Sequence, residues 1–174
     1  MKISLDKHWH LAENDYELEL SELEFSLLRV SSAFERWRAD CMACCTDQSL
    51  SGADTAVLNV VRMHDRPKSI SDIGRQLNRD DQSNLQYGIR KLVKAGMIEK
   101  ASNSDSKKGV TYVVTDLGRE VTDRYSQFRR QLLIALTRSV STDKSLSDVA
   151  RVLNLMAGMY DQAACVVAAH RVSR

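Results

Sequence analysis

The sequence predicts a mainly α-helical protein with one small β-hairpin, in which a compact centre is flanked by long helices at both ends of the chain. Three observations lead to this fold class. Apolar residues near both ends recur at alternating spacings of three and four, which is typical of helices that pack lengthwise on other helices. Short segments between them begin with capping-box pairs, which mark helix starts. One later stretch alternates β-branched and aromatic residues after a cluster of turn formers, which indicates a hairpin.

Composition sets the class of protein. The 174 residues are 43% hydrophobic and 28% charged with one proline, as expected of a soluble, helix-rich chain. No apolar run approaches the ~18 residues of a membrane span, and the N-terminus lacks an apolar signal core, so we expect a cytoplasmic protein without a membrane partner. The net charge of +2 combines −5 over residues 1–24 with +7 over the rest. A basic body with an acidic arm is compatible with a polyanionic partner.

The first long helix is expected from Leu20 to about Cys44. Its stripe consists of Leu20, Leu23, Leu27, Val30, Phe34, Trp37, Cys41 and Cys44. Such a stripe over three heptads predicts a helix that packs against another helix along its whole length.

Three short helices joined by tight turns are predicted next, and together they make a helix-turn-helix unit. Ser51 with Asp54, and Ser69 with Asp72, have the spacing of capping boxes. The first helix stops before Pro67, which cannot continue it. Asp81 is expected to cap the third helix, which occupies the stretch from Arg79 to Val93.

A hairpin and two more helices complete the chain. The segment MIEKA, the turn-forming loop SNSDSKKG and the segment VTYVVT predict two strands with an exposed tip. Thr115 is expected to cap a long helix that reaches Leu136. After a break around 139–144, a last helix carries Leu146, Val149, Leu153, Met156, Tyr160, Ala163 and Val167.

A helix-turn-helix followed by a β-hairpin is a winged helix, a unit that inserts one helix into the major groove of DNA. The central part of the chain resembles the MarR family of bacterial transcription regulators. The resemblance lies in two stretches, SISDIGRQLNRDDQSNLQYGIRKLVKAGMIEK and NSDSKKGVTYVVTDLGREV. The matching residues are Ile73, Leu77, Asp81, Ser83, Lys91, Leu92, Gly96, Ile98, Asp105, Lys107, Thr115, Gly118 and Arg119. The resemblance covers residues 51–124 by motif and the flanking helices by layout. It implies a two-fold dimer built from the terminal helices and, in many members, a small aromatic effector.

The chain departs from the family pattern in three places. Gly88 stands where a bulky aliphatic is usual, Tyr87 where a basic residue is frequent, and Lys107 and Lys108 where the wing tip usually has arginine. Gly88 lies beside the core face, about 60° from Leu85, so it is expected to allow close packing or a slight bend.

The helical angle of each residue separates a core face from a DNA face. At about 100° per residue, Leu85, Ile89 and Leu92 share the core face. Glutamine can pair with adenine and arginine with guanine, whereas lysines suit phosphates. The predicted DNA-binding residues are Gln82, Ser83, Asn84, Gln86, Tyr87, Arg90, Lys91 and Lys94 on the helix at about 81–95, with Lys107 and Lys108 in the wing at about 102–110. For any one of them, a solvated polar side chain is the simpler interpretation.

The terminal helices are expected to form a homodimer that binds a pseudo-palindromic operator on double-stranded DNA. The predicted interface residues are Leu20, Leu23, Leu27, Val30, Leu153, Met156, Tyr160 and Val167. This divides the chain into an N-terminal arm and dimerisation helix at 1–46, a winged helix-turn-helix at 47–115 and C-terminal dimerisation helices at 116–174.

The cysteines of CMACC at 41–45 have three interpretations: a structural role, redox sensing or a metal site. Cys41 and Cys44 continue the apolar stripe, which favours burial, and Cys45 lies off it and is the better candidate for a reactive thiol. Zinc would need about four ligands, and His64 is a conceivable extra one. We expect no metal and no cofactor.

The sequence motifs also bear on two other function classes, an enzyme and a protein-interaction module. The sequence has no Gly-rich phosphate loop, H-E-x-x-H or G-x-S-x-G motif, so an enzyme is not expected. The alternative to a regulator is a winged-helix protein-interaction module without specific DNA binding, which Asp80, Asp81 and Gly88 would suit.

Overall fold

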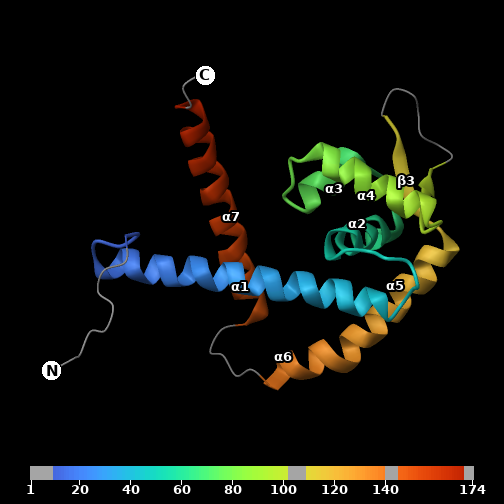
Figure 1. The fold of residues 1–174 in the computed structure, drawn as a ribbon, viewed down its shortest axis with the longest axis horizontal. Coiled ribbons are helices and arrows are strands. Elements are labelled where there is room, and N and C mark those ends of the chain that lie inside the picture. The colour runs from blue at the N-terminus through green and yellow to red at the C-terminus, as the bar shows by residue number, and fades with distance from the viewer. Residues whose placement is uncertain (1–9, 102–108, 140–144, 171–174) are drawn as a thin grey trace. The chain divides into compact units, whose positions relative to one another are not determined.

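A computed structural model describes residues 10–101, 109–139 and 145–170 (Figure 1). The chain divides into two compact units, one up to Leu132 and one from Leu133, and each is described separately. The predicted fold class is confirmed: the chain is mainly helical with a small antiparallel sheet in a winged helix.

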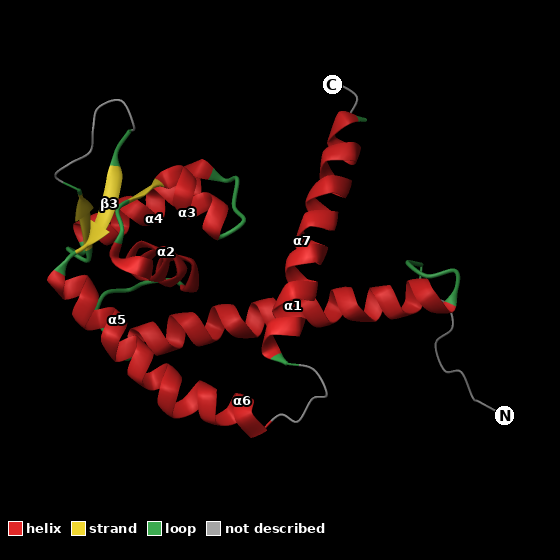
Figure 2. Cartoon of the chain, turned by 180° about the vertical axis from the view of Figure 1, so that it is seen from behind, coloured by secondary structure: helices red, strands yellow, loops and turns green. Residues whose placement is uncertain are grey.

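The predicted helices and the hairpin occur in the predicted order, and the structure adds β1, η1 and η2 (Figure 2). They are α1 (Asp15–Ala43), α2 (Gly52–Arg62), the 3-10 turn η1 (Met63–Asp65), β1 (Lys68–Ser69), α3 (Ile70–Gln76), α4 (Gln82–Lys94), β2 (Ile98–Lys100), β3 (Thr111–Val114), α5 (Asp116–Phe128), the π-helical segment η2 (Arg129–Ile134), α6 (Ala135–Ser139) and α7 (Leu146–Ala169).

Helix α1 begins five residues earlier than the apolar stripe indicates. Asn14 is its N-cap, and the Asn14 side chain accepts a hydrogen bond from the Glu17 N–H at 3.0 Å. Only the C-terminal end of α1 joins the core of the winged helix, through Cys41 and Met42. The N-terminal half is largely exposed despite its apolar side chains, among them Leu28 with 63% of its surface accessible.

Helix α2 forms the middle of the core and packs against α1, α4 and α5 (Figure 1). Both predicted capping boxes are present, with Ser51 and Asp54 at the start of α2 and Ser69 and Asp72 at the start of α3. The most deeply buried side chains come from the end of α1 and the residues after it, α2, α3, α4 and the segment that leads into the wing: Met42, Cys45, Thr55, Val57, Leu58, Val61, Ile73, Leu85, Ile89, Leu92, Met97 and Ile98.

The wing is part of a three-stranded antiparallel sheet in the order β1-β3-β2. In the predicted hairpin, Ile98 pairs with Val114 and Lys100 with Tyr112. The third strand, β1, was not predicted, because its two residues pair with β3 only once the chain has folded back.

Helix α5 does not continue as one α-helix to Leu136. Residues Arg129–Ile134 are π-helical before α6 resumes the α-helix. A π segment holds one extra residue per turn, so it shifts the phase of the side chains that follow it.

The second unit contains α7, which is capped by Ser145 as its side chain accepts from the Asp148 N–H. An 18-residue window of α7 has a mean hydropathy of 1.3 and is 6% buried, so by length and composition this helix could span a membrane, which the sequence did not lead us to expect. Length and composition alone are weak evidence of a span. The charged and amide side chains of α7 lie within about 140° of one another around the helix, which favours packing of the apolar side on protein. They are Asp148, Arg151, Asn154, Asp161 and Gln162.

Candidate nucleic-acid interface

A tight turn joins α3 to α4. The Arg79 N–H donates to the Gly74 carbonyl at 2.9 Å, and Asn78 has a positive φ of 50°. A Cβ on Gly74 would lie 2.9 Å from the Arg79 carbonyl oxygen, so glycine is what lets the turn close. The turn presents α4 across the end of α3, as in a helix-turn-helix.

Helix α4 has the predicted two faces. Leu85, Ile89 and Leu92 are buried in the core, at 2% exposure or less. On the other side, the exposed residues are Gln82, Ser83, Asn84, Gln86, Tyr87, Arg90 and Lys94. Tyr87 is 65% exposed, so its ring and hydroxyl are accessible on this side of the helix.

The cations of α4 differ in their surroundings. Lys91 is half-buried and its Nζ lies 2.7 Å from the Asp54 carboxylate on α2. Within the described part of the chain, neither Arg90 nor Lys94 has an ion-pair partner. Arg90 and Lys94 are therefore available to a polyanion, whereas Lys91 already has a counter-ion.

Asp81 stands at the N-cap position of α4 but does not cap it with its side chain, which corrects the sequence prediction. Its carboxylate accepts hydrogen bonds from Arg79 Nε at 2.8 Å and Asn84 Nδ2 at 3.0 Å. Hydrogen bonds from Arg79 and then Asn84 hold the pKa of Asp81 at about 2. A guanidinium two residues away is a stronger donor than a backbone N–H, so it takes the carboxylate.

The wing tip lies outside the described residues, and Lys107 and Lys108 with it. The strands that carry it are described, and they extend from the end of α4 and return to the start of α5 (Figure 2). The hairpin thus stands directly after α4 in the chain.

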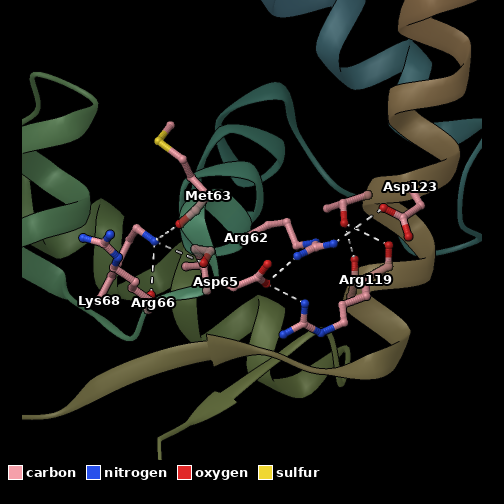
Figure 3. Close-up of polar contacts among 10 residues, drawn as sticks. Arg62, Met63, Asp65, Arg66, Lys68, Arg119 and Asp123 are labelled. Atoms are coloured by element: carbon pink, nitrogen blue, oxygen red, sulfur yellow. Dashed lines mark hydrogen bonds and ion pairs between the residues drawn. The ribbon is translucent and has the colours of Figure 1, made fainter.

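An ion-pair network at the base of the wing was not predicted (Figure 3). Asp65 accepts from Arg62 and Arg119, and Arg62 also lies 3.8 Å from Asp123, so the end of α2 is tied to α5. Hydrogen bonds from Arg119 and then Arg62 lower the pKa of Asp65 from its ordinary value. The only sign of this ion-pair network in the sequence was the spacing of three residues between Arg62 and Asp65. That spacing is too common in helices to predict an ion pair.

Lys68 completes this corner. Its Nζ donates to the carbonyls of Met63 and Arg66, the latter at 3.1 Å, and it approaches that of Val61 at 3.4 Å (Figure 3). It thus satisfies carbonyl groups at the end of α2 and in the turn that follows. Burial, and then the charge of Arg66, lower the pKa of Lys68. The corner holds β1 beside β3 and so braces the wing.

A hollow of about 330 Å³ lies between the start of α2 and the outer side of α4. Its lining combines cations, an aromatic ring and polar groups: Ser51, Ala53, Asp54, Val57, Arg79, Asn84, Tyr87, Gly88 and Lys91. The predicted DNA-binding residues Asn84, Tyr87 and Lys91 therefore border a space that a small molecule could occupy.

Cys41 is buried as predicted, but the predictions for Cys44 and Cys45 are wrong. Cys45 is buried, with 1% of its surface exposed, and Cys44 is exposed, the reverse of what the spacing of the apolar stripe indicated. At about 100° per residue Cys45 lies about 40° from the buried Cys41 and Cys44 lies about 60° from it, so the step of three that extended the stripe to Cys44 did not exclude burial of Cys45. Burial, and then the charge of Cys44, raise the pKa of Cys45, while burial and the neighbouring thiols raise that of Cys41 to about 11. Among the described residues, no group of three or more His, Cys, Asp or Glu side chains could hold a metal ion.

Comparison with known proteins agrees with this geometry. Residues 50–118 match the family of winged helix DNA-binding domains. No curated protein matches the sequence.

Several solved structures share the fold over most of the chain. A MarR family regulator from Neisseria meningitidis has a TM-score of 0.67 at 14% identity, over 84% of this chain and 96% of that one. The transcriptional regulator BldR from Sulfolobus solfataricus has a TM-score of 0.64 at 16% identity, over 84% and 99%. A mutant of MarR from E. coli complexed with operator DNA has a TM-score of 0.63 at 19% identity, over 82% and 99%.

Proposed function

We propose that the protein is a sequence-specific transcription regulator which binds DNA as a homodimer. Its match to winged helix DNA-binding domains and its fold, which is that of the MarR-family regulators, support this proposal. The observation that carries the proposal is the outer face of α4. Seven of the eight residues predicted to contact DNA there are exposed, on a helix whose other face is buried in the core. We expect this action in the bacterial cytoplasm, where the DNA is.

The residues of α4 suit two kinds of contact. Gln82, Gln86 and Arg90 carry the groups that pair with base edges in the major groove, where each base pair has a distinct pattern of donors and acceptors. Lys94 at the end of α4, and the wing lysines Lys107 and Lys108, suit phosphates, which add affinity with little sequence information. This division predicts that substitutions in the two groups have different effects on specificity.

Arg90→Ala and Lys94→Ala test the proposal as a pair. The operator is first selected from random DNA with the purified protein, and affinities are then measured over a range of salt. Arg90→Ala should cost about 1–3 kcal/mol and relax the preference at one base pair. Lys94→Ala should weaken binding to all sequences alike and lower the salt slope by about 1. If both variants bind like the parent, α4 does not enter the groove.

The homodimer proposal rests on apolar surface that the single chain leaves exposed. On α1, Leu20, Leu23 and Val30 are 38%, 41% and 65% exposed, and on α7, Leu153, Tyr160 and Val167 are 42%, 41% and 65% exposed. Leu27 is half-buried and Met156 is buried in the chain itself. An apolar surface of this extent is unusual for a monomer in water, and two half-sites about one turn of DNA apart require two copies.

A small aromatic effector is the finer part of the proposal. The hollow beside α4 is lined by the Tyr87 ring, on which an aromatic ligand could stack, and by the side chains of Ser51 and Asn84, which could form hydrogen bonds to it. A ligand there would contact the helix that binds DNA, so it could change its affinity. Titration of the protein–DNA complex with small aromatic acids, with release of DNA as the signal, measures this directly.

The competing function is a winged-helix module that binds protein. It predicts DNA binding without sequence preference that vanishes at physiological salt, whereas a regulator shows a salt slope together with a large ratio of specific to nonspecific affinity. The same selection experiment therefore separates the two.

A further inference from the structure

A buried carboxylate joins the start of α2 to the recognition helix α4. Asp54 has 6% of its surface exposed. Its Oδ2 accepts a hydrogen bond from the Ser51 N–H at 2.9 Å, as part of the capping box, and another from Lys91 Nζ at 2.7 Å. Burial alone would raise the pKa of Asp54, but the hydrogen bonds from Lys91 and Ser51 outweigh it and lower the pKa. The carboxylate is therefore ionised at neutral pH and held in place from both sides.

Lys91 is held as firmly as its partner. About a third of its side chain is exposed, and its ammonium group sits against a carboxylate that water hardly reaches. Removing one member of such a pair leaves an uncompensated charge in a site of low polarity, so the pair resists separation. A phosphate of DNA would have to compete with Asp54 for this cation.

Gly88 brings the two helices close at the same point. A Cβ on Gly88 would lie 3.2 Å from Asp54 Oδ1, closer than most Cβ contacts. One turn of α4 thus presents Gly88 to one oxygen of Asp54 and Lys91 to the other. The glycine and the lysine together define where α4 lies along α2.

We propose that Asp54 is a positioning residue for DNA recognition: through Lys91 and the space at Gly88 it sets the orientation of α4, and Lys91 serves this contact in place of a phosphate. This rests on the proposed function, since it assigns roles within the same DNA-binding helix. It also removes Lys91 from the predicted phosphate contacts. Tyr87 and Arg90, on the same turn of α4, are the side chains whose placement in the groove depends on it.

The test compares Lys91→Met with Lys94→Met in the full chain. Methionine keeps the apolar stem of lysine and removes the charge. Lys91→Met should lower the ratio of operator to nonspecific affinity at least about fivefold, while the salt slope stays that of the parent. Lys94→Met, the matched exposed cation on the same helix, should lower both affinities alike and the salt slope by about 1. Binding is measured well below the melting temperature of each variant.

Two further variants identify Asp54 as the partner. Asp54→Asn keeps an oxygen that can accept from the Ser51 N–H, so the capping box has an acceptor and the fold is retained. It should lower the same affinity ratio, and combined with Lys91→Met it should add little, whereas its effect should add fully to that of Lys94→Met. Lys91→Arg, which keeps the charge, should restore a ratio near that of the parent.

The outcomes separate the two claims. If Lys91→Met behaves like Lys94→Met and adds fully to Asp54→Asn, Lys91 is a phosphate contact, and this inference is wrong while the regulator remains. If the parent protein itself shows no preference among DNA sequences, the proposed function fails, and the positioning role fails with it.

Discussion

Gly88 is where the choice of a single residue has the clearest physical reason. Alanine in an exposed helix interior usually gains about 1 kcal/mol over glycine. At Gly88 the added Cβ would instead press on Asp54 Oδ1, 3.2 Å away, and that carboxylate is held by Ser51 and Lys91. We therefore expect Gly88→Ala to lower the free energy of unfolding by about 0.5–1.5 kcal/mol, measured by urea denaturation.

Gly158 on α7 is the matched control, because a Cβ there would meet nothing within 4 Å. Gly158→Ala should raise the free energy of unfolding by about 0.5–1 kcal/mol. If both substitutions raised the free energy of unfolding equally, the Asp54 carboxylate would move away from the added Cβ without loss of stability. Glycine would then not be required at position 88.

Single residues also mark the limit of what the sequence could predict. The capping roles of Ser51 and Ser69 were predictable because their partners lie three residues away, within one local motif. The ion pair of Lys91 with Asp54 joins residues 37 positions apart, and no periodicity indicates such a contact. Asp81 failed as a side-chain cap for a local reason: Arg79 competes for its carboxylate.

At the scale of elements, the end of α1 determines which thiol of the CMACC segment is exposed. Burial raises the pKa of Cys41 and Cys45, and Cys45 Sγ donates to the Cys41 carbonyl at 3.1 Å, so both are held as buried thiols. Cys44, at the C-cap, is exposed. In native protein at neutral pH, we expect iodoacetamide to modify Cys44 at least about tenfold faster than Cys41 or Cys45, as mass spectrometry of peptides would measure. Faster modification of Cys45 in folded protein would restore it as the reactive thiol.

Helices were easier to predict than their irregularities. The stripe of Leu117, Val121, Tyr125, Phe128, Leu132 and Leu136 predicted one helix, and the structure interrupts it with a π segment. A signal existed: its steps are four, four, three, four and four residues, longer on average than the 3.6 of an α-helix. Strand β1 had no such signal, because two residues are too few to show alternation.

At the scale of the whole molecule, the chain is a winged helix with more apolar surface than one copy buries. The winged helix has its own core, built from the end of α1, α2 to α4, the wing and α5. The N-terminal half of α1 and nearly all of α7 contribute little to any core in the single chain. The sequence pattern predicted these helices, but the pattern alone does not say what covers their apolar sides.

The dimer proposal predicts that a charged substitution disrupts the dimer only when it lies on the apolar side of α7. Leu153 lies opposite the polar side chains of α7, and Leu155 lies among them, about 160° away. Both are exposed in the single chain, Leu153 at 42% and Leu155 at 65%. Leu153→Glu should convert the dimer to a monomer and weaken operator binding by about a hundredfold, because the second half-site is lost. Leu155→Glu should leave both properties unchanged, although it adds the same charge to a more exposed position. Light scattering gives the mass and a DNA titration the affinity. A parent protein that is monomeric at micromolar concentration, or equal effects of the two substitutions, would exclude a dimer built on this side of α7.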